Sequence, residues 1–298
     1  MPTYTRKRSK FWLGVFEKED IFGNRDINVY VNSITKGLLK KFSPQLIKYS
    51  PTGWKESSQK KYLFNLWFPY NRIDEFCLAE LDRIKTWAEH ANQHIWLSKN
   101  SYTENYFAGD EVDYCMAADW NMYFDNRKRT TIGEAEYQIK YNSPKGFLSE
   151  EDTMTYVKIL TSAIDDCVDC LPFNLSKYIV TAIPAVREKQ CKLAWELAKY
   201  TAHKIGAPFM EATLMKDKPQ MKEKSIGDKI RIWREIFAKR DMIELSCIVE
   251  GKKILIIDDL YQSGASIWCF AEFLKKQCDA KKVIAITSVK ALKDGDNQ

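Results

Sequence analysis

The chain has 298 residues, of which 45% are hydrophobic and 29% are charged, and its formal net charge is +6. A chain of this length can bury a full core and commonly forms two domains. No apolar run reaches transmembrane length, and the basic N-terminus lacks the apolar segment of a signal peptide, so we expect a cytoplasmic protein without a membrane partner. The mildly basic charge suits a phosphorylated ligand or nucleic acid but requires neither.

Residues 1–127 are predicted to form a mixed α+β region of unknown fold that is rich in aromatic residues. Strands are expected at 11–16, 27–31 and 62–68. The clearest helix covers 73–97, because apolar residues recur there at helical spacing and Asp74 can cap it. The tryptophans and tyrosines of this region could stack on a base or dock a protein partner.

Two pairs of potential metal ligands lie in predicted helices. His90 and His94 are four residues apart, but no third ligand is nearby in sequence, and we interpret them as exposed helix histidines. Cys167 and Cys170 form a Cys-x-x-Cys without a second pair at zinc spacing. Buried or surface thiols are therefore favoured over metal or redox use.

A polar turn at 125–129 marks the predicted start of a second domain, 128–298. The alternating piece 137–141 predicts the first strand of this domain. A helix is expected at 148–171, with Ser149 as its cap and three acidic residues in its first turn.

The next predicted strand ends in a loop with two cations. Residues 178–183 form a short apolar run that is typical of a buried parallel strand. The loop after it contains Ala185, Val186, Arg187 and Lys189. The two cations suit an anionic ligand, and solvated charges at the start of the next helix, 191–205, are the alternative.

The most basic segment of the chain follows a strand predicted at 209–214. Residues 215–234 have little regular apolar pattern before Ile226. Their long polar side chains include Lys216, Lys218, Gln220 and Lys222. A mobile cationic lid would be attracted to a polyanionic ligand and would exclude water on closing; a solvated run of charges is the alternative. A further strand is predicted at 242–249.

The most informative stretch is 252–290. An apolar run at 254–257 ends in Asp258 and Asp259, and an amphipathic helix and a second apolar run, 283–289, follow. The turn between run and helix is Gln262, Ser263, Gly264, Ala265 and Ser266. Strand, loop, helix and strand in one sheet imply a right-handed parallel crossover. Backbone N–H groups and hydroxyls at the helix start suit a phosphate, and the two carboxylates suit vicinal hydroxyls, magnesium or both. The combination indicates a ribose 5-phosphate; an ordinary turn with solvated acids is the alternative.

Residues 254–266 resemble the phosphoribosyl pyrophosphate (PRPP) signature of the type I phosphoribosyltransferases. That signature has an apolar strand, two acids, an apolar residue, any residue, two Thr/Ser-type residues, Gly, a small residue and Thr/Ser. The segment Asp-Asp-Leu-Tyr-Gln-Ser-Gly-Ala-Ser is most similar to the ComF-like branch of this family. The resemblance covers about 131–298 and implies an α/β domain with a mainly parallel central sheet, in which ligands bind at the carboxyl ends of the strands.

The resemblance also implies residue roles. Asp258 and Asp259 would hold the ribose hydroxyls and, indirectly, a magnesium ion, while residues 262–266 would cradle the 5-phosphate. The loop 185–189 would bind pyrophosphate, with Arg187 as a catalytic cation, and 215–234 would be a flap.

One position departs from the family pattern. Gln262 stands where many members have Thr and where purine-salvage enzymes have an acidic base, which disfavours a purine acceptor.

The sequence therefore predicts a magnesium-dependent phosphoribosyltransferase that acts on PRPP or a ribose 5-phosphate nucleotide with a nitrogenous acceptor. A non-catalytic PRPP or nucleotide sensor is one alternative. A nucleic-acid-associated factor is another, in which the flap and the N-terminal basic residues contact phosphates. A homo-oligomer or a protein partner of residues 1–127 is compatible with each of these functions.

Overall fold

The computed structural model divides the chain into two compact units. It describes residues 2–58, 60, 62–99, 101–186, 193–219, 221 and 224–292. Unit 1 comprises Met1–Trp96 and Asp169–Phe173, and unit 2 comprises Leu97–Val168 and Asn174–Gln298. The division falls earlier than the predicted boundary after residue 127, because β7 (Tyr114–Trp120) pairs with β14 (Lys282–Lys290) in the main sheet of unit 2.

Unit 1 is built on a five-stranded antiparallel sheet with the order β1-β2-β3-β5-β4. Its strands are β1 (Thr3–Tyr4), β2 (Leu13–Glu19), β3 (Arg25–Asn32), β4 (Lys55–Glu56) and β5 (Leu63–Phe68). Ile27, Val29 and Val31 of β3 are buried, whereas Asn28 and Tyr30 between them are partly exposed. This alternation places one side of the sheet in a core and leaves the other to polar and aromatic side chains.

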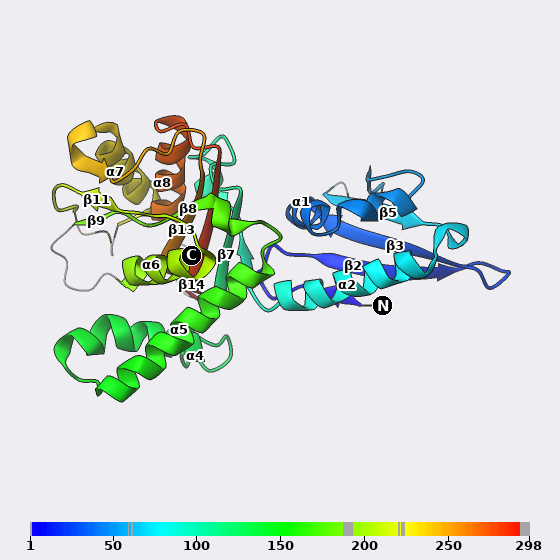
Figure 1. Cartoon of the computed structure of the whole chain (residues 1–298), viewed down its shortest axis with the longest axis horizontal. Coiled ribbons are helices and arrows are strands. Elements are labelled where there is room, and N and C mark those ends of the chain that lie inside the picture. Colours follow the sequence, from blue (N-terminus) through cyan, green and yellow to red (C-terminus); the bar gives the residue numbers. More distant parts are fainter. Residues whose placement is uncertain are drawn as a thin grey trace. The chain divides into compact units, whose positions relative to one another are not determined.

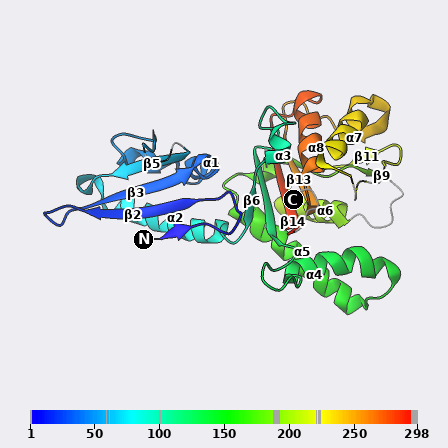
Figure 2. The same cartoon turned by 180° about the vertical axis from the view of Figure 1, so that it is seen from behind.

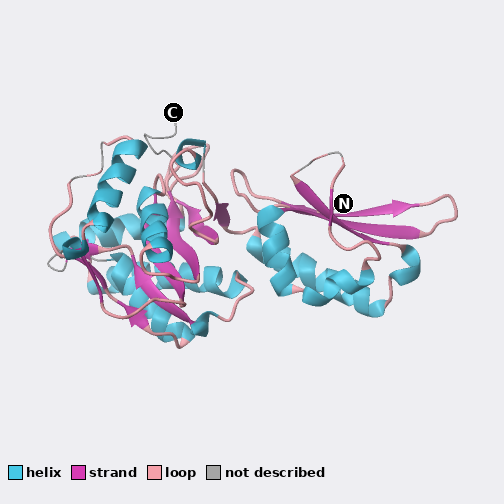
Figure 3. Ribbon diagram, turned by 90° about the horizontal axis from the view of Figure 1, so that it is seen from above, coloured by secondary structure: helices cyan, strands magenta, loops and turns pink. Residues whose placement is uncertain are grey.

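The helices of unit 1 lie on the buried face of the sheet, and no helix of this unit's described residues lies on the opposite face (Figure 3). They are α1 (Ser33–Phe42) and α2 (Glu75–Ala91), with 3₁₀ turns η1 (Pro44–Tyr49) and η2 (Tyr70–Arg72). Asp74 caps α2 as predicted, because its Oδ1 accepts the N–H of Cys77 at 2.7 Å. The ring of Trp87 in α2 contacts the ring of Phe11, which precedes β2, at 5.6 Å and the ring of Phe42 in α1 at 4.7 Å.

Two expectations about potential metal ligands have different outcomes. Helix α2 ends at Ala91 rather than at residue 97, and His94 beyond it is only 4% exposed, so its interpretation as an exposed helix histidine is wrong. Cys167 and Cys170 are both buried, which agrees with their interpretation as buried or surface thiols. Within the described ranges, no group of three or more His, Cys, Asp or Glu residues is arranged to hold a metal ion.

Unit 2 contains a six-stranded sheet with the order β10-β8-β13-β14-β7-β6 (Figure 1). Besides β7 and β14, its strands are β8 (Tyr178–Ala182), β10 (Phe209–Met210), β13 (Lys253–Tyr261) and, at the point where the chain passes from unit 1 to unit 2, β6 (Ile95–Leu97). The pairings from β10 through to β7 are all parallel, which confirms the mainly parallel α/β sheet.

Helices cover both faces of this sheet (Figure 2). They are α3 (Ser101–Glu104), α4 (Thr131–Tyr137), α5 (Glu150–Cys170), α6 (Leu193–Ile205), α7 (Ile226–Ala238) and α8 (Ala265–Lys276). Ile254 and Ile256 of β13 share a core with Trp233 of α7 and Phe270 of α8, whereas α6 packs on β8 and β13 from the other side. Burial on both faces explains the unbroken apolar run in β13.

The predicted strand at 137–141 is wrong. These residues continue α4 as a π-helical turn, η3 (Gln138–Asn142), followed by 3₁₀ turn η4 (Ser143–Lys145). Thr130 caps α4 by accepting the N–H of Gly133 at 3.0 Å. A Cβ at Gly133 would lie 2.1 Å from the carbonyl oxygen of Asn121, so the glycine allows α4 to rest directly on the chain after β7.

The segment predicted as one strand at 209–214 is divided between two sheets. After β10, β11 (Ala212–Leu214) enters a small sheet with the order β12-β11-β9, where β9 is Ala185–Val186 and β12 is Ile243–Leu245. The segment predicted as a flap is helical from Ile226 onward, because α7 packs its apolar side against α8. Two further 3₁₀ turns are η5 (Leu175–Lys177) and η6 (Arg240–Met242). No helix in the described part of the chain combines the length and apolarity needed to cross a bilayer.

Candidate functional site

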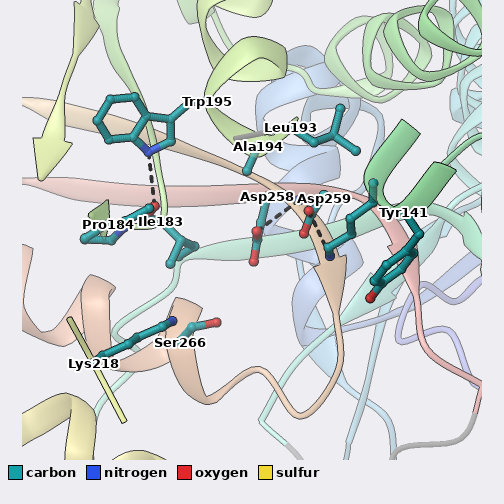
Figure 4. Close-up of a pocket in the computed structure, with 12 residues that line it drawn as sticks. Tyr141, Ile183, Pro184, Leu193, Ala194, Trp195, Lys218, Asp258, Asp259 and Ser266 are labelled. Carbon is teal, nitrogen blue, oxygen red and sulfur yellow. Dashed lines mark hydrogen bonds and ion pairs between the residues drawn. The ribbon is translucent and has the colours of Figure 1, made fainter. Parts of the chain in front are cut away.

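The carboxyl ends of β8 and β13 meet at one edge of the unit 2 sheet. Ile257 of β13 pairs with Ala182, the last residue of β8, so Asp258 and Asp259 lie beside the loop that follows β8. A cavity of about 460 Å³ opens at this edge (Figure 4). Its lining residues include Asp258 and Asp259 from β13 and Ala185 from the loop. The parallel register thus brings together the two predicted loops.

The two adjacent carboxylates have different environments. Asp258 is 9% exposed, and its Oδ1 accepts the N–H of Asp259 at 3.0 Å. Burial, followed by the nearby charge of Asp259, raises the pKa of Asp258 to about 8. Burial therefore favours the protonated form of Asp258 when no cation or ligand is bound.

Lys140 provides a positive charge directly beside this pair. The turn η3 directs its ammonium group into the cleft, where Nζ lies 2.9 Å from Asp259 Oδ2 and 3.2 Å from Glu136 Oε1. Burial disfavours the charged amine, but the carboxylates of Asp259 and Glu136 outweigh it and raise the pKa of Lys140. Burial also raises the pKa of Glu136. Lys140 therefore remains charged and compensates Asp259.

Side chains of the flanking elements β13, α8 and β14 support the turn between β13 and α8. Gly264 has φ +81°, and a Cβ there would lie 2.2 Å from the hydroxyl oxygen of Tyr261. That hydroxyl accepts the Nε1–H of Trp268 at 3.1 Å. The Nζ of Lys290 donates to the carbonyl of Gln262 at 2.9 Å. Glycine is required here both for its left-handed backbone and for the close approach of Tyr261.

This turn presents the start of α8 to the cleft. Gly264 at the N-cap of α8 provides no side-chain cap, and among the described residues Ser263 Oγ accepts only the N–H of Ala265, at 3.5 Å, so the following N–H groups of the first turn are available to an anion. A second cavity of about 510 Å³ lies over the turn. The two cavities share the lining residues Lys140, Tyr141, Lys218, Asp259 and Ser266, so they are adjoining parts of one cleft.

Lys218 adds a second ammonium group to this cleft. It lines both cavities, and it lies near Ser266 in Figure 4. Its Nζ is 4.4 Å from the centre of the Trp233 ring, so α7 supports it through a cation–π contact.

The structure brings most, but not all, of the remaining predicted site residues into the cleft. Residues 262–266 all line the second cavity. Val186 is in β9 and does not line either cavity, and Lys216 points to Asp241 at 3.5 Å, away from the cleft. Four predicted residues lie outside the described residues: Arg187, Lys189, Gln220 and Lys222.

The cleft residues that come from η3, α6 and α7 were not identified from the sequence. Lys140 is the most important of these, and Tyr141, Trp195 and Trp233 also line the cleft. One signal was present in the sequence: Glu136 and Lys140 are four residues apart, which is the spacing of an ion pair on a helix. The pair indicated a helix where alternation over five residues suggested a strand.

The donor set of the cleft fits magnesium that is bound together with a phosphorylated ligand. Mg²⁺ in such sites is held by one or two carboxylates, by ligand phosphate oxygens and by water. Asp258 and Asp259 provide two carboxylates, and no third acidic or histidine ligand in the described ranges completes a protein-only cage. Chemically, the cleft combines an anion site at a helix start, two carboxylates for hydroxyl groups or metal, and the ammonium groups of Lys140, Lys218 and Lys229.

Comparisons with known proteins add little to this description. No protein-family model matches the chain, and no curated protein is similar to it in sequence. Among solved structures, a hypoxanthine phosphoribosyltransferase from Staphylococcus aureus is similar over 47% of this chain, with 12% sequence identity and a TM-score of 0.31. The match spans 66% of that chain, just under two thirds of its length. A likeness this distant carries no conclusion about function.

Proposed function

We propose that unit 2 binds PRPP with magnesium and transfers its phosphoribosyl group to a nitrogenous acceptor. One observation carries the proposal: Asp258 and Asp259 share a cleft with a rigid turn that presents the uncapped start of α8. A ribose 5-phosphate needs this combination of hydroxyl acceptors and anion site. The resemblance of residues 254–266 to the PRPP signature supports the same ligand.

Each part of the ligand has a counterpart in the proposed complex. The 5-phosphate contacts the N–H groups at the start of α8 and the Ser263 and Ser266 hydroxyls. The ribose hydroxyls contact Asp258 and Asp259. The pyrophosphate lies toward the loop after β8 and toward Lys218, which line the same cavity. Magnesium would be held by the Asp258 and Asp259 carboxylates and ligand oxygens, where it would neutralise the leaving pyrophosphate.

The residues of the cleft would act by positioning and by charge. In the transfer, the bond from the anomeric carbon to pyrophosphate breaks, a bond to the acceptor nitrogen forms, and the acceptor's proton leaves to solvent or to a base. The ribose becomes cationic at the transition state, and the fixed carboxylate of Asp259 stabilises that charge. Lys140 holds this carboxylate in place, so it is a positioning residue.

A non-catalytic sensor of PRPP or of a nucleotide is the second candidate. Gln262 motivates it, because this residue provides an amide where purine-salvage enzymes have an acidic base. The two functions differ in turnover: an enzyme releases pyrophosphate from PRPP with some member of a panel of nitrogenous bases and amines, and a sensor releases none.

Equilibrium binding of labelled PRPP to the full chain tests the shared part of both functions. We expect magnesium-dependent binding that Asp259→Asn weakens about 100-fold or more. Asp166→Asn is the matched control, because Asp166 is exposed on α5 and does not line the cleft. If wild type fails to bind PRPP with magnesium, or if both variants bind equally well, the proposal is wrong.

A further inference from the structure

The open face of the unit 1 sheet carries aromatic and amide side chains in alternating positions. Three adjacent strands, β2, β3 and β5, contribute to it. One cross-strand row consists of Phe16, Asn28 and Trp67, and the next consists of Gly14, Tyr30 and Asn65. The three aromatic residues are only partly buried, and within the described part of unit 1 no helix covers this side of the sheet (Figure 3). A soluble sheet that packs on one side usually shows mainly polar residues on the other, so three aromatic residues here are unusual.

The rings are held in place by neighbouring groups. The Phe16 and Tyr30 rings are 5.7 Å apart in an edge-to-face contact. A Cβ at Gly14 would lie 2.5 Å from the Phe16 ring. Because glycine has no side chain, the Phe16 ring can pack over β2 at this position. Trp67 donates its Nε1–H to Asp26 at 2.9 Å. The face is therefore a preorganised platform that loses little entropy on binding a flat ligand.

The amides between the rings keep hydrogen-bonding capacity. Asn65 Nδ2 donates to Asn28 Oδ1 at 3.1 Å. Among the described residues, this contact leaves a donor on Asn28 and an acceptor on Asn65 for a ligand. Side-by-side donor and acceptor groups match the edges of nucleobases.

A cavity of about 340 Å³ adjoins the platform. Tyr30, Asn65 and Trp67 line it, and the segment around β4 contributes Lys55, Glu56 and Ser57. Unit 1 also carries most of the chain's excess charge: it has 16 Lys and Arg against 11 Asp and Glu, a net charge of +5, whereas unit 2 has 30 against 29. The ligand that matches this face is thus aromatic and hydrogen-bonding, and the positive net charge of unit 1 as a whole favours a polyanion over a neutral molecule.

We propose that the open face of unit 1 binds single-stranded nucleic acid. Successive bases stack on Phe16, Tyr30 and Trp67, one base enters the cavity over Asn65, and Lys55 contacts the backbone. Stacking on these rings requires free base faces. In a duplex the base faces are covered by the neighbouring base pairs, so we do not expect a duplex to bind in this way. The proposal depends only on unit 1 and is independent of PRPP binding by unit 2.

Fluorescence anisotropy with the full chain and a labelled 12-nucleotide single strand of mixed sequence tests the proposal. At about 50 mM salt we expect saturable binding that weakens steeply as salt rises. Tyr30→Ala and Phe16→Ala should each weaken binding by about tenfold. The same sequence as a duplex should bind at least about tenfold more weakly, because its base faces are hidden.

The control variant lies on the covered side of the unit. Phe76→Ala removes an aromatic ring that is 78% exposed on α2, and it should leave binding unchanged. Circular dichroism and thermal melting establish that each variant is folded, and PRPP binding by the Phe16 and Tyr30 variants should equal that of wild type. The proposal is overturned by absent binding, by equal affinity for duplex and single strand, or by equal effects of Phe76→Ala and Tyr30→Ala.

Discussion

The two sheets of this protein differ in how they are covered, and this difference determines where each can bind a ligand. The unit 2 sheet has helices on both faces, so its exposed chemistry is confined to the ends of its strands, where Asp258, Asp259 and Lys140 meet. The unit 1 sheet has helices on one face, so the other can present side chains along the strands. In unit 2, the covered sheet confines the candidate site to a cleft at the strand ends, where the pKa values of Asp258 and Lys140 are raised. In unit 1, the open sheet offers a broad surface of side chains.

The largest expected effect comes from the turn that shapes the cleft. Gly264→Val places a branched side chain at φ +81° against the Tyr261 hydroxyl. We expect loss of PRPP binding by about 100-fold or more, and a loss of about 1–3 kcal/mol in the free energy of unfolding. Calorimetry and urea denaturation measure the two effects. Gly206→Val is a control, because Gly206 also has positive φ but has no atom within 4 Å of its Cβ position; it should lose stability and retain binding.

The pH dependence of stability tests the burial of Asp258. Its pKa of about 8 in the folded chain lies above its ordinary value of 3.8, so the folded state keeps a proton that the unfolded chain releases. The free energy of unfolding should therefore fall as pH rises from about 4 to about 8, by about 1.4 kcal/mol for each pH unit at most.

Asp258→Asn removes this contribution. The variant should be more stable than wild type by a few kcal/mol near pH 8 and should show no gain near pH 4. Denaturation at a series of pH values measures the difference. A variant that is destabilised equally at all pH values would contradict the protonated state of Asp258.

Removal of Lys140 should have a moderate effect. Lys140→Met leaves Glu136 and Asp259 without their shared cation, so we expect a loss of about 1–3 kcal/mol in stability. We also expect weaker PRPP binding, because Asp259 is no longer held. Adding Glu136→Gln should restore part of the stability by removing one of the two carboxylates, and a double-mutant cycle measures this coupling. Strictly additive effects would show that the ion pair at 3.2 Å is unimportant.

The smallest expected effect concerns single charges on the open sheet. Lys55→Gln should reduce the slope of log affinity against log salt for a single strand by about 1. Lys41→Gln, which removes an exposed charge from α1 on the covered side, should change it by less. Equal slopes for the two variants would indicate diffuse attraction to unit 1 rather than a defined path over the face.

The sequence predicted those parts of the fold in which local patterns and tertiary context agree. The apolar runs of β8, β13 and β14 and the Asp74 cap of α2 are examples. It failed where a short pattern was ambiguous: residues 137–141 alternate, but the cap at Thr130 and the packing of Gly133 make this segment helical. The sequence also did not predict β7. Its small residues show no clear strand pattern by themselves, and the strand is defined by its pairing with β14.

The candidate site was only partly visible in the sequence for a similar reason. Asp258, Asp259 and the turn that follows are contiguous, so one motif contains them. Lys140 reaches the same cleft from more than a hundred residues earlier in the chain, and only the fold brings it to Asp259. Residues that join a site through tertiary structure leave no local signal of their function.

The most direct measurement is a crystal structure of the protein with PRPP and magnesium. Our account predicts the ribose hydroxyls against Asp258 and Asp259 and the 5-phosphate over residues 264–266 at the start of α8. Density for the ligand anywhere else, or a cleft that stays empty at saturating PRPP, would contradict it.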